Sequence, residues 1–298
     1  MLTNIRMLAI AASFVLVAAC TAGGGEASLG TSTAPSDAPV DTPSSETIEH
    51  PTGPTDVILR FEEGGGFVMP AFLATQAPHF TLYGDGTIVF RNPMADPPQA
   101  IGSVFPMHPF RTAKLSEDQV QDLLVSALGE HGLGVARPEY RNDLVADAAT
   151  AVFTVNAGGV NKTVSIYALG LEMENDPDAA ARAAFTRLRD RLVDIDAGGA
   201  FETAEFVPER YRGVLLEGQP GAPDAKAWPW TDIAPTDFVA NADPNTFQLP
   251  ARVMTPDEVA ELGIEPFTGG FQGLTLIGPD DGKFYTFSLR PLLPDETE

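Results

Sequence analysis

The clearest periodic signal in the chain is an alternation of apolar and polar residues on both sides of a short turn. Residues 79–91 read His-Phe-Thr-Leu-Tyr-Gly-Asp-Gly-Thr-Ile-Val-Phe-Arg, with Gly84-Asp85-Gly86 at the centre. Asp-Gly between alternating runs is a strong hairpin signal, because the turn needs positive φ angles that glycine adopts without strain. The pattern predicts an antiparallel hairpin in which Asp85 is a turn residue.

Further strands are predicted where short apolar or alternating runs are bounded by Gly, Pro or Asn. Two pairs of runs read as hairpins, and two runs read as single strands. The paired runs are 150–155 with 162–167 and 273–277 with 284–289, and the single runs are 56–61 and 213–217.

Helical periodicity is confined to a few segments. Residues 115–128 place apolar side chains on one face, with Ser116 as N-cap and Gln119 completing a capping box. A longer helix is predicted to begin with Asp176 as its cap and to end near Ile195, and Thr255 is expected to cap a short helix that reaches Leu262.

Hairpins outnumber helices, and the strand–helix–strand alternation of a parallel nucleotide-binding sheet is missing from the pattern. We therefore expect an α+β fold, with a mostly antiparallel β-sheet of hairpins packed on one face by two main helices. The globular domain is expected over 55–298, and the stretch near 197–212 permits sub-modules at 55–198 and 199–298.

The amino terminus has the pattern of an export signal. Arg6 is followed by thirteen residues, Met7 to Ala19, that are interrupted only by Ser13. As a helix this run would measure about 20 Å, short of the ~30 Å hydrocarbon core of a bilayer. The pattern predicts a signal peptide over 1–19 and not a spanning helix.

The end of this run carries a resemblance. Val17-Ala18-Ala19-Cys20 resembles the lipobox of bacterial lipoproteins, in which an aliphatic residue and two small residues precede a Cys. The resemblance implies cleavage between Ala19 and Cys20, a lipid on the Cys20 thiol, and anchoring at the extracytoplasmic face of the cell membrane. Two or three acyl chains, palmitate among them, would anchor the chain stably. The alternative is an ordinary secretory signal with a coincidental Cys.

Residues 20–54 are expected to be a disordered tether. They are rich in Ser, Thr, Pro and Gly, carry five acids, and contain neither Lys, Arg nor an aromatic residue, so they offer little apolar area for a core. His50 falls in this segment and is expected to be exposed and without a role.

Four strings in the body extend the resemblance to uncharacterised lipoproteins of actinobacterial type. These are F-T-L-Y-G-D-G-T-I-V-F, L-S-E-D-Q-V, D-A-A-T-A-V-F-T-V and L-R-P-L-L-P-D-E. The group has no assigned activity, so the resemblance implies a location and a fold but no mechanism.

Charge and motif content limit the function classes. The chain has 18 Lys and Arg against 41 Asp and Glu, a net charge of −23, which excludes nucleic-acid partners because such a surface repels phosphate backbones. A single Cys excludes an intrachain disulfide and a Cys-based zinc site. The four His residues form no H-E-x-x-H, and G-x-S-x-G, S-x-x-K and a phosphate-binding loop are missing. No catalytic residue, cofactor or metal is predicted from these patterns.

Residues 194–205 match part of a calcium-binding loop. Asp194, Asp196, Glu202 and Glu205 stand at positions 1, 3, 9 and 12, with Gly199 at position 6. Gly198 at position 5 and Pro208 beyond the loop count against it. The alternative is a helix that ends at a Gly cap and is followed by a strand.

Trp228-Pro229-Trp230 contains both tryptophans of the chain. Exposed, the two rings would form a platform for a sugar or an apolar side chain. Buried, they would anchor a long loop to the core. Both alternatives stay open.

The sequence favours a lipid-anchored, non-enzymatic binding or interaction module of the cell envelope, with an envelope protein or a saccharide as ligand. The competing hypothesis is a secreted hydrolase whose catalytic residues meet only in the fold. A deep pocket that holds a carboxylate or His with a shifted pKa would favour the hydrolase.

Overall fold

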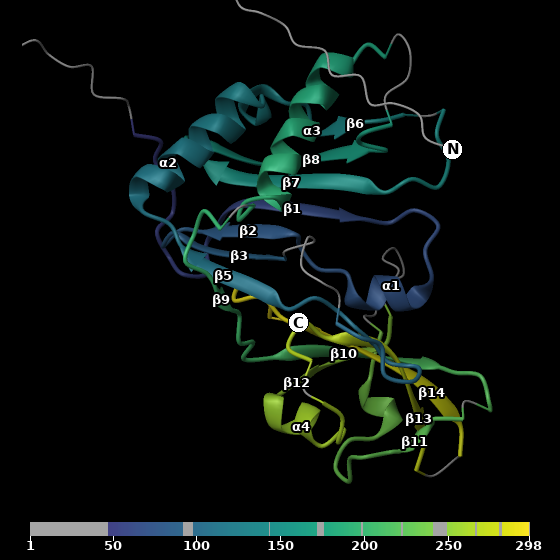
Figure 1. Cartoon of the computed structure of the whole chain (residues 1–298). Helices are drawn as coiled ribbons and strands as arrows, with labels where there is room; N and C mark the ends of the chain where they lie inside the picture. Colours follow the sequence, from purple (N-terminus) through teal and green to yellow (C-terminus); the bar gives the residue numbers. More distant parts are fainter. Residues whose placement is uncertain are drawn as a thin grey trace, which may run out of the picture. The chain divides into compact units, whose positions relative to one another are not determined.

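The computed structural model describes residues 47–91, 98–142, 144–171, 176–197, 199–221, 223–240, 249–265, 267–279 and 282–297. The predicted cleavage site at Ala19 and lipid attachment at Cys20 lie outside these residues, as do the signal peptide and residues 20–46 of the expected tether. The described residues form four α-helices and fourteen strands in two mostly antiparallel sheets (Figure 1). The predicted α+β class is confirmed.

The first sheet has eight strands in the order β6-β8-β7-β1-β2-β3-β5-β9. All neighbours are antiparallel except β6 and β8. The strands are β1 (Val57–Gly64), β2 (Phe80–Tyr83), β3 (Thr87–Arg91), β5 (Phe110–Lys114), β6 (Glu139–Tyr140), β7 (Thr150–Ala157), β8 (Val160–Tyr167) and β9 (Ala204–Glu205). Both predicted hairpins of this half are confirmed, and Asp85 accepts the Thr87 amide at 2.9 Å in the first turn.

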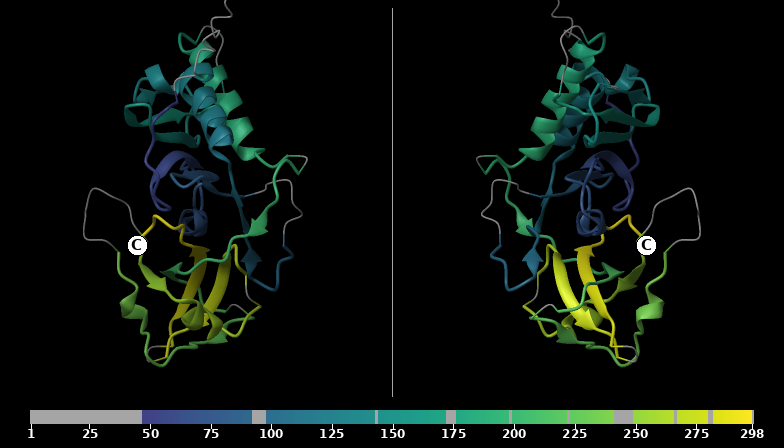
Figure 2. Two further views of the ribbon diagram at one scale, coloured as in Figure 1. Left: turned by 90° about the vertical axis from the view of Figure 1, so that its left-hand side faces the viewer. Right: turned by 90° about the vertical axis from the view of Figure 1, so that its right-hand side faces the viewer.

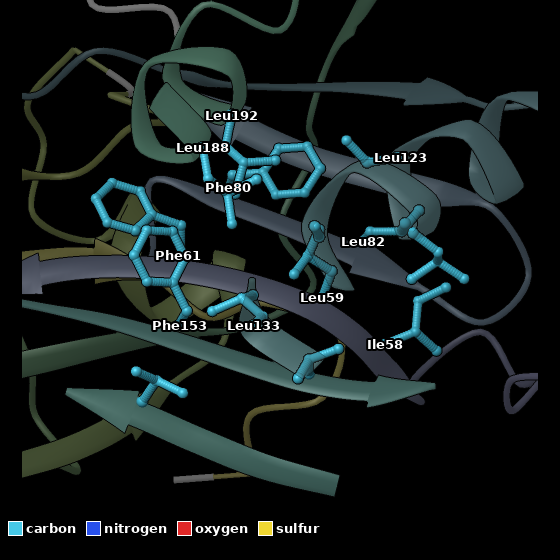
Figure 3. Packing of buried hydrophobic residues seen from close by; sticks show 14 of the residues in the cluster. Ile58, Leu59, Phe61, Phe80, Leu82, Leu123, Leu133, Phe153, Leu188 and Leu192 are labelled. Carbon is cyan, nitrogen blue, oxygen red and sulfur yellow. The ribbon is translucent and has the colours of Figure 1, made fainter. Parts of the chain in front are cut away.

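Helices α2 (Glu117–Val125) and α3 (Ala179–Val193) cover one face of this sheet, and Figure 2 shows them next to each other. Their apolar faces supply Leu123, Leu188 and Leu192 to a core that also contains Phe61 and Phe153, whose ring centroids are 4.9 Å apart (Figure 3). The period-two pattern of the strands and the 3.6-residue pattern of the helices thus meet in one apolar layer.

Helix capping was predicted correctly for α2 and incorrectly for α3. Ser116 and Gln119 form the expected capping box. The N-cap of α3 is Asp178, two residues after the expected Asp176. The Asp176 carboxylate has other partners, since it accepts the Asp178 amide at 2.8 Å and forms an ion pair with Arg182.

The remaining strands form a second sheet in the order β11-β13-β14-β10-β12, with β4 also paired to β13. They are β4 (Phe105–Pro106), β10 (Tyr211–Glu217), β11 (Lys226–Ala227), β12 (Ala251–Met254), β13 (Phe271–Ile277) and β14 (Phe284–Pro291). The predicted β13–β14 hairpin is confirmed, and Thr255 caps α4 (Pro256–Ala260) as expected. The strands divide into two sheets because β10 pairs with β14 and β12, and not with the edge strand β9.

The sequence pattern does not predict the short helix α1 (Pro70–Thr75), whose N-cap Met69 has extended backbone angles. It packs on β13 and β14, where the buried Gln272 side chain donates to Thr75 Oγ1. Only six residues are helical, so the periodic signal that would reveal the helix in the sequence is very short.

Residues 47–54, which composition assigns to the tether, lie against the first sheet. The Ile48 amide donates to Gln121 Oε1 at 2.8 Å, and Ile48 packs on the core. His50, expected to be exposed, has a side chain that is 6% exposed, and its Nε2 lies 3.2 Å from Glu117 Oε1. The folded part therefore extends back to about residue 47.

The carboxyl-terminal segment connects the second sheet to the first. It contacts the face of the first sheet that α2 and α3 do not cover. Asp295 Oδ1 lies 2.6 Å from Arg60 Nη2 and accepts the Tyr83 hydroxyl at 2.7 Å, while Glu296 binds Arg290 with both carboxylate oxygens at 2.8 Å. Burial and the bond to Asp295 raise the pKa of Tyr83.

Glu62 lies beside this network. Burial raises its pKa, Arg60 opposes that shift, and Glu296 adds to it. The folded state therefore holds the Glu62 proton more tightly than the unfolded chain does, so ionising Glu62 costs stability as pH rises through its folded pKa.

We predict that Glu62→Gln unfolds at a higher denaturant concentration than the parent at pH 7, because the amide avoids the cost of a buried carboxylate. The difference should shrink as the pH falls below about 4, where the parent carboxyl is protonated in both states. Urea unfolding across this range measures it. Parallel stability curves for the two proteins would contradict the prediction.

Candidate functional site

Three loops meet at one end of the first sheet, on the right in Figure 1. Gly64 at the end of β1 is paired with Thr150 at the start of β7, and Thr150 is paired with Tyr167 at the end of β8. The segments that adjoin these paired residues are therefore neighbours. They are 65–69, 141–142 with 144–149, and 168–171. We call this set of segments the loop end.

A buried arginine holds the loop end together. Arg182 of α3 is 0% exposed, donates to the Tyr167 carbonyl at 3.0 Å and to the Arg141 carbonyl at 2.9 Å, and its Nε lies 3.0 Å from Asp176 Oδ2. A guanidinium is stable in a core only when it is paired and hydrogen-bonded. One side chain thus ties the ends of β6 and β8 to the segment before α3.

Backbone strain is concentrated at the same place. Among the described residues, the non-glycine residues with positive φ are Asp147, at 57°, and Ala168, at 54°. Both belong to the loop end, where the Asp147 carbonyl accepts the Phe67 amide at 3.3 Å and the Ala168 amide donates to Ala149 at 2.9 Å. Such strain persists where the surroundings impose it, and it often accompanies a functional surface.

A hollow of about 260 Å³ opens beside these loops. Its lining residues are Glu139, Tyr140, Arg141, Thr150, Ser165 and Tyr167. Glu139 and Arg141 form an ion pair at 2.7 Å, and the Tyr167 hydroxyl accepts the Ala148 amide at 3.0 Å. The lining offers hydroxyls, a carboxylate and a guanidinium for binding a polar group. None of the six is His or Cys, so the hollow does not place the Ser165 hydroxyl beside an imidazole.

Exposed apolar side chains are frequent at the loop end and at the start of α1. Six of the twelve large apolar side chains that are exposed among the described residues lie at the loop end or in the first turn of α1. They are Phe67 (91% exposed), Val68 (38%), Met69 (67%), Phe72 (52%), Leu144 (77%) and Leu171 (53%). Single exposed apolar residues are ordinary, whereas a cluster of this kind marks an interaction surface.

Two of the histidines, His79 and His131, have packing roles in the structure. His79 stacks on Phe61 with ring centroids 5.7 Å apart, and burial together with the charge on Arg91 lowers its pKa. His131 Nδ1 lies 2.9 Å from the Ser126 carbonyl. This contact stabilises the helical turn that follows α2.

The calcium-loop hypothesis does not describe residues 194–205. Asp194 is the C-cap of α3, Asp196 accepts the Phe201 amide at 3.2 Å, and Glu205 belongs to β9, where it accepts the Thr268 hydroxyl. No group of three or more His, Cys, Asp or Glu that could hold a metal occurs in the described part of the chain. A helix end followed by a strand matches the structure, but the C-cap is Asp194 and not the expected glycine.

The tryptophan pair belongs to the core of the second sheet. Trp230 is 4% exposed, Trp228 is half-buried, and their ring centroids are 5.1 Å apart. The Trp228 indole donates to the Ile233 carbonyl at 2.6 Å, and the Trp230 indole donates to the Glu258 carbonyl at 2.7 Å. The structure favours the packing alternative over the exposed platform, because both polar edges of the rings already have backbone partners.

No protein-family model, curated protein or solved structure matches the chain, so the chemistry of the loop end rests on its own residues. None of the helices among the described residues is long and apolar enough to cross a membrane.

Removing the Arg182 charge should destabilise the protein strongly. In Arg182→Met the Asp176 carboxylate loses its ion-pair partner and the Tyr167 and Arg141 carbonyls lose their buried donor, which we expect to cost about 3–5 kcal/mol. Arg187→Met, on the exposed face of the same helix, is the matched control and should change stability by less than about 0.5 kcal/mol. Urea unfolding measures the free energy of unfolding of both variants. Equal losses in the two would contradict the role of Arg182 in holding the loop end together.

Fluorescence tests the position of the tryptophans. In Trp228→Phe the remaining Trp230 should emit at short wavelength and be quenched only weakly by acrylamide, because its ring is enclosed by Phe238 and Phe287. Quenching close to that of free tryptophan would restore the platform hypothesis.

Proposed function

We propose that this chain is an exported lipoprotein that is cleaved between Ala19 and Cys20 and held at the extracytoplasmic face of the cell membrane by lipid on Cys20. The observation that carries this proposal is Val17-Ala18-Ala19-Cys20 at the end of a thirteen-residue apolar run. Cys20 is also the single thiol in the chain, and a thiolate is the side chain best suited to accept a diacylglyceryl group.

We further propose that the body is a non-enzymatic binding or interaction module and that the loop end is its contact surface. Three features support this. The loop end carries exposed apolar side chains, Arg141, Thr150 and Tyr167 at the ends of its strands line a polar hollow, and Arg182 holds its backbone in place. An apolar centre with a polar surround is the usual anatomy of an interface. The net charge of −23 favours neutral or cationic partners of the envelope over anionic polymers.

The lipid attachment is tested by Cys20→Ser. Cells that express the parent or the neighbouring control Thr21→Ser should incorporate labelled palmitate into the protein and retain it in the membrane pellet. Cys20→Ser should lose the label and move to the soluble or secreted fraction, because no other thiol is present to carry the lipid. A labelled Cys20→Ser protein in the pellet would contradict the proposal.

A further inference from the structure

Four of the exposed apolar side chains, Phe67, Val68, Met69 and Phe72, lie within six consecutive residues, and we call this segment the tip. Phe67, Val68 and Met69 are consecutive, follow Gly65 and Gly66, and lead directly into α1, where Phe72 is also exposed. Phe67 is 91% exposed, more than a flat surface leaves to a side chain of its size, and Leu144 on the adjoining loop is 77% exposed. Exposed aromatic and aliphatic side chains of this kind suit insertion into the interfacial region of a lipid bilayer better than docking on a flat protein surface.

The tip is also uncharged. Gly64–Pro78 contains no Asp, Glu, Lys or Arg, although 20% of the chain is charged and its net charge is −23. This stretch can therefore approach a lipid surface with less desolvation and less repulsion than the acidic remainder. Asp147, whose carbonyl accepts the Phe67 amide, would stay in the aqueous headgroup layer.

The chain outside the structure is long enough for such an approach. The Gly158 amide donates to the Glu49 carbonyl at 2.7 Å, so the start of the described chain lies at the β7–β8 turn, the opposite end of the sheet from the loop end. The eight residues of β7 measure about 26 Å. Residues 20–46 can span at most about 90 Å, which exceeds the length of the sheet and leaves chain to reach a bilayer.

We propose that the loop end inserts Phe67, Met69 and Phe72 into the interfacial region of the bilayer to which Cys20 is anchored, so that the body lies on the membrane in one orientation. This inference rests on the proposed lipid anchor, and it names the bilayer as the partner of the proposed contact surface. The anchor keeps the tip at high effective concentration near lipid, so that an insertion too weak to bind a free protein is sufficient. The hydrogen bonds from Arg182 hold the loop backbone in place before it contacts lipid. Insertion therefore costs less conformational entropy.

An environment-sensitive fluorophore tests the insertion in the complete, lipidated chain. Met69→Cys provides the only free thiol once Cys20 is modified, and it is labelled with a nitrobenzoxadiazole probe before reconstitution into phosphatidylcholine vesicles. Val135→Cys is the control, because Val135 is also 91% exposed and lies near the opposite end of β8, where Lys162 bonds the Gly134 carbonyl. Nitroxide-bearing lipids should quench the probe at 69 about twofold or more relative to the probe at 135.

A second comparison removes the apolar tip without touching the core. Phe67→Ser with Phe72→Ser, in the chain labelled at 69, should abolish the extra quenching, whereas Val135→Ser with Val207→Ser should leave it unchanged. All four side chains are exposed, so every variant should unfold at the temperature of the parent, and thermal unfolding verifies this.

The alternative occupants give different results. Equal quenching at 69 and 135 on vesicle-bound protein would overturn the insertion and leave the anchor intact. A blue shift of the probe at 69 without vesicles, rising with protein concentration, would assign the tip to a second copy of the chain and overturn the proposal. A chain that does not sediment with vesicles would contradict the proposed lipid anchor. The insertion rests on the anchor and would be contradicted as well.

Discussion

The ion pair between Arg182 and Asp176 is the constraint on which the geometry of the loop end depends. A guanidinium occupies a core position on α3, and its cost is offset by one carboxylate and by the carbonyls of Tyr167 and Arg141. The carbonyls belong to the ends of β8 and β6, so the ion pair fixes where the following loops begin. The positive φ angles of Asp147 and Ala168 are tolerated within this fixed frame.

A second set of arginines joins the two sheets. Arg60 and Arg290 hold the carboxyl-terminal acids Asp295 and Glu296, while Arg91 stacks over the Phe110 ring at 4.3 Å and donates to the Gly269 carbonyl at 3.3 Å. Burial and the nearby Arg290 lower the pKa of Arg91 to about 10. Several of the few bases in an acidic chain are thus used inside the fold, which leaves the surface strongly negative.

Local signals in the sequence predicted local structure well. The Gly84-Asp85-Gly86 turn and the Ser116 capping box are encoded within a few residues, and both are found as expected. The division into two sheets depends on pairing between distant segments, such as β10 with β14, which no short pattern specifies. The burial of Arg182 could have been predicted from the sequence, because this residue lies three residues before Phe185 on the apolar face of α3. The loop end could not be predicted, because its three segments meet only through strand register and the exposure of Phe67 is a property of the folded surface.

We propose that the loop end is the surface with which this protein contacts a membrane. Hydrogen exchange of the backbone amides, measured on the lipidated chain in a bilayer and on the same chain released from its lipid, tests this claim most directly. The account predicts that the bilayer slows exchange in residues 65–72 and 144–149 and leaves the β7–β8 turn at 156–160 unchanged. Slowed exchange at the turn with none at the loop end, or no difference anywhere in the body, would contradict it.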